Sequence, residues 1–180
     1  DSMFYVLYFQ EPGVAEAELE RDVRQTLLKM LAGGSVAGGL GERLPGDPIG
    51  MVRRDGGLLT DRSAPTSLPN WLTQADLDFY IGEFERTGFR GGLNWYRNAD
   101  KNWELLASLA GAKVTVPALY MVGDRDLILA FQGMDKVVAN LASLVPQLRA
   151  KIILPGCGHW TQQERAPEVN AAMIDFLRQL

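Results

Sequence analysis

The sequence predicts a protein of the α/β class, in which helices cover a parallel β-sheet. Two short apolar segments carry this prediction, VTVPALYMV at residues 114–122 and KIIL at residues 151–154, each followed by a turn that contains glycine. A strand that is buried on both faces of a parallel sheet has this uninterrupted apolar character. Residues 134–148 and 167–180 have helical patterns, and a parallel strand pair requires such a crossover helix.

The N-terminal part of the sequence is mostly helical. A helix is expected over residues 13–31, because apolar residues recur there at helical spacing and several glutamates lie near its N-terminus. A second helix is expected to begin after Thr73, whose side chain can form a cap with Asp76, and to end near Gly88. The final helix has Pro167 in its first turn, where proline is well tolerated.

A loop rich in glycine and proline is expected between the first two helices, over residues 33–67. Nine of the 19 glycines fall between Gly33 and Gly57, and such a segment cannot hold a regular helix. Only two strands are predicted in the C-terminal part, and two strands do not make a stable sheet by themselves. The chain also begins at Asp1 rather than at a methionine, so we expect it to be a piece of a longer fold.

Composition excludes several classes of function. The 180 residues include 18 Lys and Arg against 22 Asp and Glu, a net charge of -4, so neither nucleic acid nor an anionic membrane is an expected partner. No apolar run is long enough to span a membrane. A single cysteine and a single histidine exclude an internal disulfide and argue against a structural zinc site. These features predict a cytoplasmic globular protein without a metal.

Two polar side chains follow the predicted strands. Asp126 and His159 both lie just beyond the carboxyl end of a strand, the edge of a parallel sheet where catalytic groups are usually mounted. An acid that orients a histidine, which then acts as a general base, is the minimal charge-relay pair. The alternatives are structural, with Asp126 capping a helix and His159 held in a turn by its backbone. Asp124 is a competing acid that spacing does not separate from Asp126.

No nucleophile is evident in the sequence. The nearest approach to the G-x-S-x-G nucleophile elbow, at residues 33–37, fails at Ala37 and follows no predicted strand. Cys157 could be proposed as a thiol nucleophile, but a small residue that fills a turn explains it better, because a thiol and its base should converge from different elements. Phosphate-binding and dinucleotide-binding glycine motifs do not occur, so no organic cofactor is expected.

Two aromatic stretches occur in the N-terminal part, FYVLYF at residues 4–9 and LNWYRN at residues 93–98. Packing of aromatic rings in a helical region explains most of these residues. A second interpretation is that a phenol from each stretch donates a hydrogen bond to a substrate oxygen.

Four segments together resemble soluble epoxide hydrolases of the α/β-hydrolase fold. They are YVLYFQEPGVAEAE at residues 5–18, GFRGGLNWYRN at 88–98, VGDRDL at 122–127 and GCGHWTQ at 156–162. The resemblance implies a partial α/β-hydrolase fold. Residues 1–108 would be the helical cap with its loop over 33–67, and residues 109–180 the C-terminal part of the core. The N-terminal half, which carries the nucleophilic aspartate in that family, is missing from this sequence.

The same resemblance implies a reaction and its residues. Epoxides are hydrolysed to vicinal diols through an alkyl-enzyme ester, with no cofactor. Tyr5 and Tyr96 would hold the epoxide oxygen, His159 would activate the hydrolytic water, and Asp126 rather than Asp124 would orient the histidine. The neighbouring side chains expected to contact a small apolar epoxide are Phe4, Val6, Trp95 and Trp160. The isolated chain is predicted to be inactive without the missing half.

Two other functions remain open at this point. A haloalkane dehalogenase would use a similar aspartate and histidine but would bind halide through tryptophan or asparagine donors rather than two phenols. Alternatively, the chain is a non-catalytic fragment that folds by docking with a partner chain or with a second copy as a homodimer. An unpaired edge of the predicted sheet would favour such association.

Overall fold

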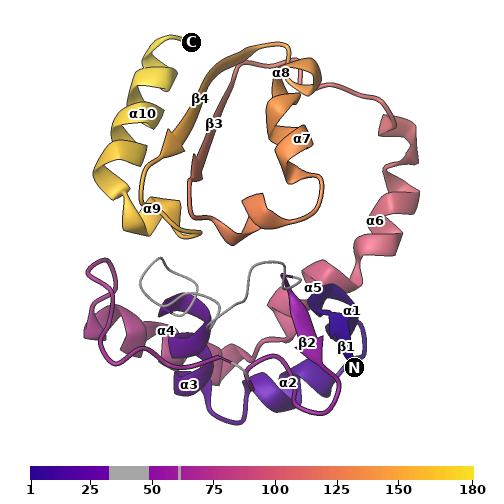
Figure 1. Ribbon diagram of the computed structural model, residues 1–180, viewed down its shortest axis with the longest axis vertical. Helices are drawn as coiled ribbons and strands as arrows, with labels where there is room; N and C mark the ends of the chain where they lie inside the picture. Colours follow the sequence, from indigo (N-terminus) through magenta and orange to yellow (C-terminus); the bar gives the residue numbers. More distant parts are fainter. Residues whose placement is uncertain (33–48, 61) are drawn as a thin grey trace. The chain divides into compact units, whose positions relative to one another are not determined.

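The computed structural model describes residues 1–32, 49–60 and 62–180. They form two compact units, Asp1–Ser108 and Leu109–Leu180, which are described separately below (Figure 1). The segment 33–37, the nearest match to a nucleophile elbow, lies outside the described residues, as does much of the predicted loop over 33–67. The interpretation of the two units as a cap and part of a core stays a prediction.

The first unit begins with a small antiparallel sheet that the sequence did not predict. Strand β1 (Ser2–Phe4) pairs with β2 (Met51–Arg53), so Phe4 lies opposite Met51. The segment predicted as a loop therefore contains a strand. Helix α1 (Tyr5–Tyr8) follows β1 directly, and the backbone N–H of Tyr5 donates to the carbonyl of Gly50 at 2.7 Å. This pairing fixes the start of the helix that carries Tyr5.

The single helix predicted over residues 13–31 is wrong, because it is interrupted. The structure has α2 (Val14–Leu19), α3 (Val23–Leu27) and a π-helical turn over Leu28–Ala32. The Asp22 side chain accepts a hydrogen bond from the Gln25 N–H at 2.9 Å and starts a new helix. An aspartate at this position competes with continuation of the preceding helix.

The second predicted helix is confirmed as α4 (Gln74–Thr87). Thr73 and Asp76 form a reciprocal capping box, and Gly88 ends the helix with a φ of 69°, a conformation that glycine adopts without strain. Two further helices follow, α5 (Arg90–Arg97) and α6 (Ala99–Leu105), and a 3₁₀ turn covers Ala107–Leu109.

Two apolar clusters hold the first unit together. The first cluster joins α2 to β2 and to the α5 helix through buried side chains that include Phe9, Leu19 and Leu93. The second joins α3 to α4 through Val23, Leu27 and Leu77.

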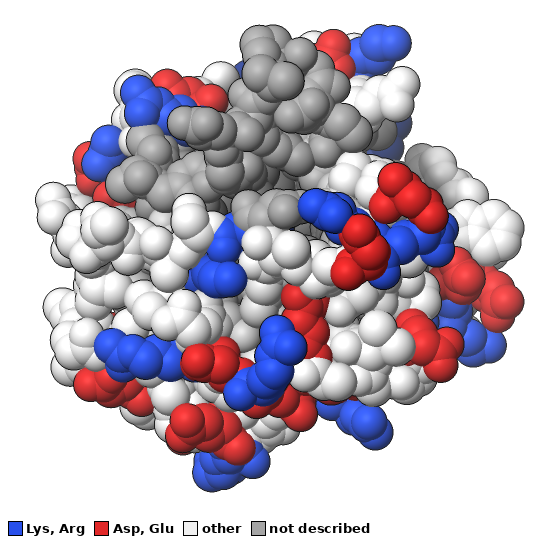
Figure 2. All heavy atoms as spheres, turned by 60° about the horizontal axis from the view of Figure 1, so that its bottom comes forward, with Lys and Arg blue, Asp and Glu red and all other residues white. Residues whose placement is uncertain are grey.

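Basic and acidic side chains are interspersed on the face drawn in Figure 2, and no extended area of a single charge is visible among its described residues.

The parallel strand pair of the second unit is confirmed. Strands β3 (Ala118–Gly123) and β4 (Leu148–Leu154) run parallel, with Tyr120 opposite Lys151. The strand predicted over residues 114–122 starts four residues late, since Pro117 has no N–H to give to a ladder. The second strand begins three residues earlier than predicted.

The helices of the second unit differ partly from expectation. Residues 134–148 do not form one helix: α7 (Met134–Ala139) and α8 (Leu141–Leu144) are separated at Asn140, and β4 follows at once. At the end of α7 the Asn140 side-chain amide donates to the carbonyl of Lys136 at 3.0 Å. A 3₁₀ turn (Leu127–Ala130) follows β3.

After β4 the chain forms α9 (Thr161–Glu164) and α10 (Ala166–Arg178), with Pro167 in the first turn of α10 as predicted. Figure 1 shows the strand pair between α10 on one side and α7 with α8 on the other. The buried residues Leu154, Cys157 and Val169 form the core between sheet and helix. Within the described parts of the chain, no helix has both the length and the apolar character that crossing a membrane requires.

Two alanine substitutions on α4, one at a buried and one at an exposed apolar residue, test which face of this helix packs in the core. Leu77 has no exposed surface, whereas Phe79 is 66% exposed. Leu77→Ala should lower the free energy of unfolding by about 2–5 kcal/mol, because it leaves a cavity. Phe79→Ala should change it by less than about 0.5 kcal/mol. Denaturant unfolding measures both, and equal effects would contradict this assignment of the core.

Candidate active site

Parallel pairing brings two of the predicted residues to one edge of a sheet. Asp126 lies three residues after the end of β3, and His159 lies five residues after the end of β4. Since the strands are parallel, their carboxyl ends meet at the same edge, and the two side chains approach each other there. The two residues are 33 positions apart in the sequence, and the α7–α8 crossover lies between them.

The imidazole of His159 contacts the carboxylate of Asp126. The Nδ1 atom lies 3.0 Å from Oδ1 and 3.1 Å from Oδ2. A carboxylate accepts hydrogen bonds, so Nδ1 is the donor in this contact, and in a neutral imidazole Nε2 then has a free lone pair. The Asp126 side chain is 9% exposed, whereas that of His159 is 38% exposed. This arrangement holds the imidazole ready to accept a proton at Nε2.

The two candidate acids have different partners. Asp126 accepts from the backbone N–H of Ile128 at 2.9 Å and so also caps the 3₁₀ turn. The capping and orienting interpretations are therefore compatible. Asp124 accepts from the backbone N–H of Gly156 at 2.8 Å and ties the end of β3 to the turn after β4. The structure pairs His159 with Asp126, and the catalytic roles of both residues stay predictions.

Sequence reasoning missed Glu164, which holds the backbone on both sides of the histidine. Its carboxylate accepts from the N–H of Gly158 at 2.7 Å and from that of Trp160 at 3.0 Å. A carboxylate that accepts two backbone hydrogen bonds restrains both peptides. The only sequence signal is an acidic residue one turn after a glycine-rich segment, which is too common to single out.

A close backbone approach explains the glycine at the end of β3. A side-chain carbon on Gly123 would overlap the carbonyl groups of Cys157 and Gly158. The N–H of Arg125 also donates to the Cys157 carbonyl at 3.0 Å. The histidine turn is therefore packed directly against the β3 backbone.

The structure argues against Cys157 as a nucleophile. Its side chain is fully buried among Leu154 and Val169. Burial raises the pKa of the Cys157 thiol to about 11, and the charge of Glu164 adds to the increase. A thiol with this pKa is almost entirely protonated at neutral pH and reacts poorly. Cys157 thus fills the turn, as the structural interpretation of this residue predicts.

The first unit brings Tyr5 and Tyr96 together. Tyr5 begins α1 and Tyr96 lies in the last turn of α5, and their ring centroids are 5.7 Å apart with an interplanar angle of 77°. Phe9 contacts both rings, at 5.6 Å from Tyr5 and 4.9 Å from Tyr96. Partial burial, and then the neighbouring Tyr96, raise the pKa of Tyr5 above its ordinary value. The phenol therefore keeps its proton at neutral pH and can donate a hydrogen bond.

The four predicted substrate-binding side chains have different environments. The Phe4 ring contacts Tyr5 at 4.7 Å between centroids, and Val6 is half-buried on α1. Trp95 is 81% exposed. Trp160 packs edge-on against His159, with ring centroids 5.1 Å apart. Phe4 and Trp160 thus lie beside predicted catalytic residues, and the binding role of all four residues stays a prediction.

The predicted site residues therefore fall into two groups, each within one unit. Tyr5 and Tyr96 form the group of the first unit, and Asp126 with His159 forms that of the second. Across the described ranges, no cluster of three or more histidine, cysteine or acidic side chains is arranged to hold a metal ion.

Comparison with known proteins shows which of them are similar to this chain. No family model matches the chain. Epoxide hydrolase A from Mycobacterium tuberculosis is 44% identical over 181 residues, which cover 98% of this chain and 52% of that protein. Bifunctional epoxide hydrolase 2 from Mus musculus is 36% identical over 174 residues, 97% of this chain and 29% of its own length. The chain spans about half the length, or less, of the curated relatives it matches.

Solved structures agree. Epoxide hydrolase A from Mycobacterium thermoresistibile aligns with a TM-score of 0.82 and 46% identity, over 99% of this chain and 53% of that one. An epoxide hydrolase from an endophytic Streptomyces aligns with a TM-score of 0.89 and 42% identity, over 99% and 52%. The class of the chain is thus a partial α/β-hydrolase fold, as predicted. Within that class, the chain is a homologue of the epoxide hydrolases, matching about half of their length.

The pairing of His159 predicts a tautomer that spectroscopy can detect. Because the chain has a single histidine, its ¹⁵N imidazole signals need no assignment. We expect neutral His159 to carry its proton on Nδ1. Asp126→Asn should shift the population towards the Nε2–H form, since the carboxylate acceptor is lost. Asp124→Asn is the matched control and should leave the tautomer unchanged, because its amide oxygen can still accept from Gly156. The opposite pattern would identify Asp124 as the orienting acid.

Proposed function

We propose that this chain provides part of an epoxide hydrolase that converts epoxides to vicinal diols through an alkyl-enzyme ester. The observation that carries the proposal is the contact of Tyr5 with Tyr96, at 5.7 Å between ring centroids. An aspartate–histidine pair serves many hydrolases, whereas two adjacent phenols suit a reaction that develops negative charge on one oxygen. The names of the relatives support the same reaction.

In the first step a carboxylate attacks one epoxide carbon, forming an ester bond as the carbon–oxygen bond of the ring breaks. Tyr5 and Tyr96 donate hydrogen bonds to the epoxide oxygen, and one phenol gives its proton to the developing alkoxide. These donors stabilise the transition state more than the ground state, because the charge on oxygen grows during ring opening. The raised pKa of Tyr5 keeps that phenol protonated until the oxygen becomes basic.

In the second step His159 acts as a general base through Nε2. It removes a proton from water as the water attacks the ester carbonyl, and the tetrahedral intermediate then collapses to the diol and the free carboxylate. Asp126 stabilises the imidazolium through the Nδ1 contact of 3.0 Å. The imidazolium then releases its proton and the phenolate takes one up, directly or through solvent, which completes the cycle.

We place the attacking carboxylate outside residues 1–180. The lengths of the relatives support this placement, because the chain covers 52% of the Mycobacterium tuberculosis protein. Exposed apolar side chains of the second unit support it too, and they include Leu109, Val116 and Leu177. Within the described residues, β3 and β4 pair only with each other, so further strands of a parallel sheet would come from the remaining part. We propose a small apolar epoxide as substrate and the cytoplasm as location.

The decisive experiment compares two preparations. One is this chain alone, and the other is this chain joined to the part of the Mycobacterium tuberculosis relative that it does not match, here named the completed chain. We predict diol formation only by the completed chain. Tyr5→Phe and Tyr96→Phe should each lower kcat roughly 100-fold, since each removes a donor to the alkoxide.

Tyr80→Phe is the matched control, because Tyr80 lies on α4 and packs in the second apolar cluster. It should retain turnover within a few-fold. Tyrosine variants that open epoxides at the full rate would contradict the proposal, and halide release from haloalkanes would then favour a dehalogenase. A homodimer seen by light scattering, with no turnover in either preparation, would favour a non-catalytic docking chain.

A further inference from the structure

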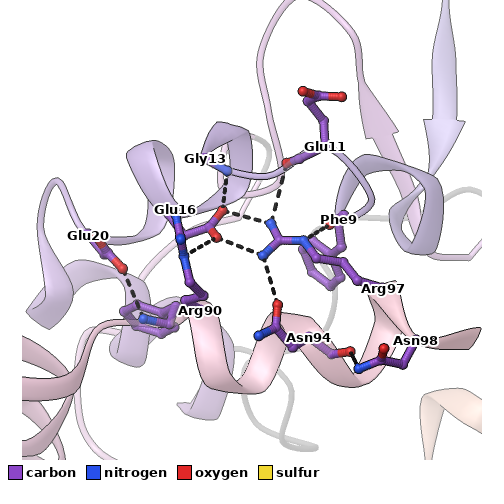
Figure 3. A network of polar contacts seen from close by, with 10 residues as sticks. Phe9, Glu11, Gly13, Glu16, Glu20, Arg90, Asn94, Arg97 and Asn98 are labelled. Carbon is purple, nitrogen blue, oxygen red and sulfur yellow. Dashed lines mark hydrogen bonds and ion pairs between the residues drawn. The ribbon is translucent and has the colours of Figure 1, made fainter.

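A buried ion pair joins α5, the helix that carries Tyr96, to α2. The guanidinium of Arg97 and the carboxylate of Glu16 form a bidentate pair, with Nη1 2.7 Å from Oε1 and Nη2 2.8 Å from Oε2 (Figure 3). Their side chains are only 12% and 8% exposed. Two parallel charge-assisted hydrogen bonds fix orientation as well as distance, which a single ion contact does not.

The remaining donors of Arg97 hold the turn that follows α1. Its Nε donates to the carbonyl of Phe9 at 2.8 Å, and Nη2 donates to that of Glu11 at 3.3 Å. Glu16 in turn accepts from the Gly13 N–H at 2.9 Å, at the start of α2. One side chain of α5 therefore restrains the backbone from Phe9 to the first turn of α2, as Figure 3 shows.

The restrained backbone directly follows α1, which carries Tyr5, and α5 carries Tyr96. Tyr96 directly precedes Arg97, and the Phe9 ring whose carbonyl Arg97 holds contacts both Tyr5 and Tyr96. A second connection runs through Gln10, whose amide donates to the carbonyls of Val6 at 2.9 Å and Tyr96 at 3.1 Å. Two polar links thus join α1 to the last turn of α5.

Such links add to the few other restraints on α1, which are the hydrogen bond from Tyr5 to Gly50 and the packing of Tyr5 and Tyr8 against the first apolar cluster. The helix is a single turn of four residues, without a side-chain cap and without a buried residue. Two hydroxyl donors that share one acceptor oxygen can lie at most about 5.6 Å apart, twice an ordinary hydrogen-bond length. A displacement of about 1 Å in such an arrangement lowers rates by orders of magnitude.

We propose that Arg97, through its bidentate pair with Glu16, is a positioning residue that sets the spacing of Tyr5 and Tyr96 for one substrate oxygen. The proposal rests on the proposed function for the identity of that oxygen. The hydrogen bonds from Arg97 hold the pKa of Glu16 at about 2, so the pair keeps both charges at any pH at which the enzyme would work.

The first test needs no activity and uses the chain as it stands. The ionisation of Tyr5 is followed by NMR of its ring signals, which Tyr5→Phe identifies among those of the five tyrosines. Because Tyr96 raises the pKa of Tyr5, Tyr96→Phe should lower that pKa in the parent chain. In an Arg97→Lys background, which keeps the charge but not the bidentate geometry, the same change should have a smaller effect or none. An undiminished effect of Tyr96→Phe in that background would overturn the proposal.

The second test separates the two chemical steps in the completed chain. Arg97→Lys should slow formation of the ester, which uses the phenols, on the order of 10-fold to 100-fold. Hydrolysis of the ester, which uses His159, should stay within about 3-fold. Arg90→Ala is the matched control, because Arg90 lies on the same helix and contacts the same Glu16 at 3.4 Å but is 68% exposed. It should leave both rates within about 3-fold of the parent.

Equal loss in both steps, or loss in neither, would overturn the proposal. If Arg97→Lys does not fold, Glu16→Gln replaces it in both tests, because it removes one of the two carboxylate oxygens that Arg97 binds. Failure of the completed parent to form diol would overturn the proposed function instead, and the titration would still decide whether Arg97 sets the spacing of the phenols.

Discussion

The parallel pairing of β3 with β4 is the constraint on which the second unit depends. It brings the carboxyl ends of two strands to one edge, so that residues 33 positions apart become neighbours. The turn after β4 lies so close to β3 that only glycine fits at position 123. Glu164 then restrains the peptides on both sides of His159. Backbone contacts thus fix the turn that carries the imidazole, and we expect Asp126 to favour the tautomer with the proton on Nδ1.

The first unit also holds two side chains from distant segments together, but without a parallel strand pair. Its two phenols come from a one-turn helix without a fully buried residue and from the last turn of α5, whose single buried residue is Leu93. Aromatic packing through Phe9 and the polar links of Arg97 and Gln10 replace the rigidity that a strand would supply. Glu16 lies in the first turn of α2, and through Arg97 we expect it to affect the spacing of the phenols as well as the stability of its own helix.

Much of this arrangement follows from the sequence, and the exceptions have physical reasons. Apolar runs predict β3 and β4, and capping residues predict the start of α4. Two predicted helices were wrong because the side chains of Asp22 and Asn140 form local hydrogen bonds that a periodicity argument does not weigh. The sheet of β1 and β2 was missed because its strands are three residues long and are 47 or more positions apart. Glu164 was missed because its backbone N–H partners leave no pattern of residue types in the sequence. Arg97 was missed because its carboxylate partner, Glu16, lies 81 positions away.

The function depends on one chemical claim, that His159 acts on an ester whose carboxylate lies outside residues 1–180. Mass spectrometry of the completed chain after mixing with an epoxide tests this claim directly. In a His159→Gln variant, the account predicts that an adduct with the mass of the epoxide accumulates on a peptide from the added part, because ring opening proceeds and hydrolysis does not. An adduct on a peptide of residues 1–180, or undiminished diol formation by the variant, would contradict it.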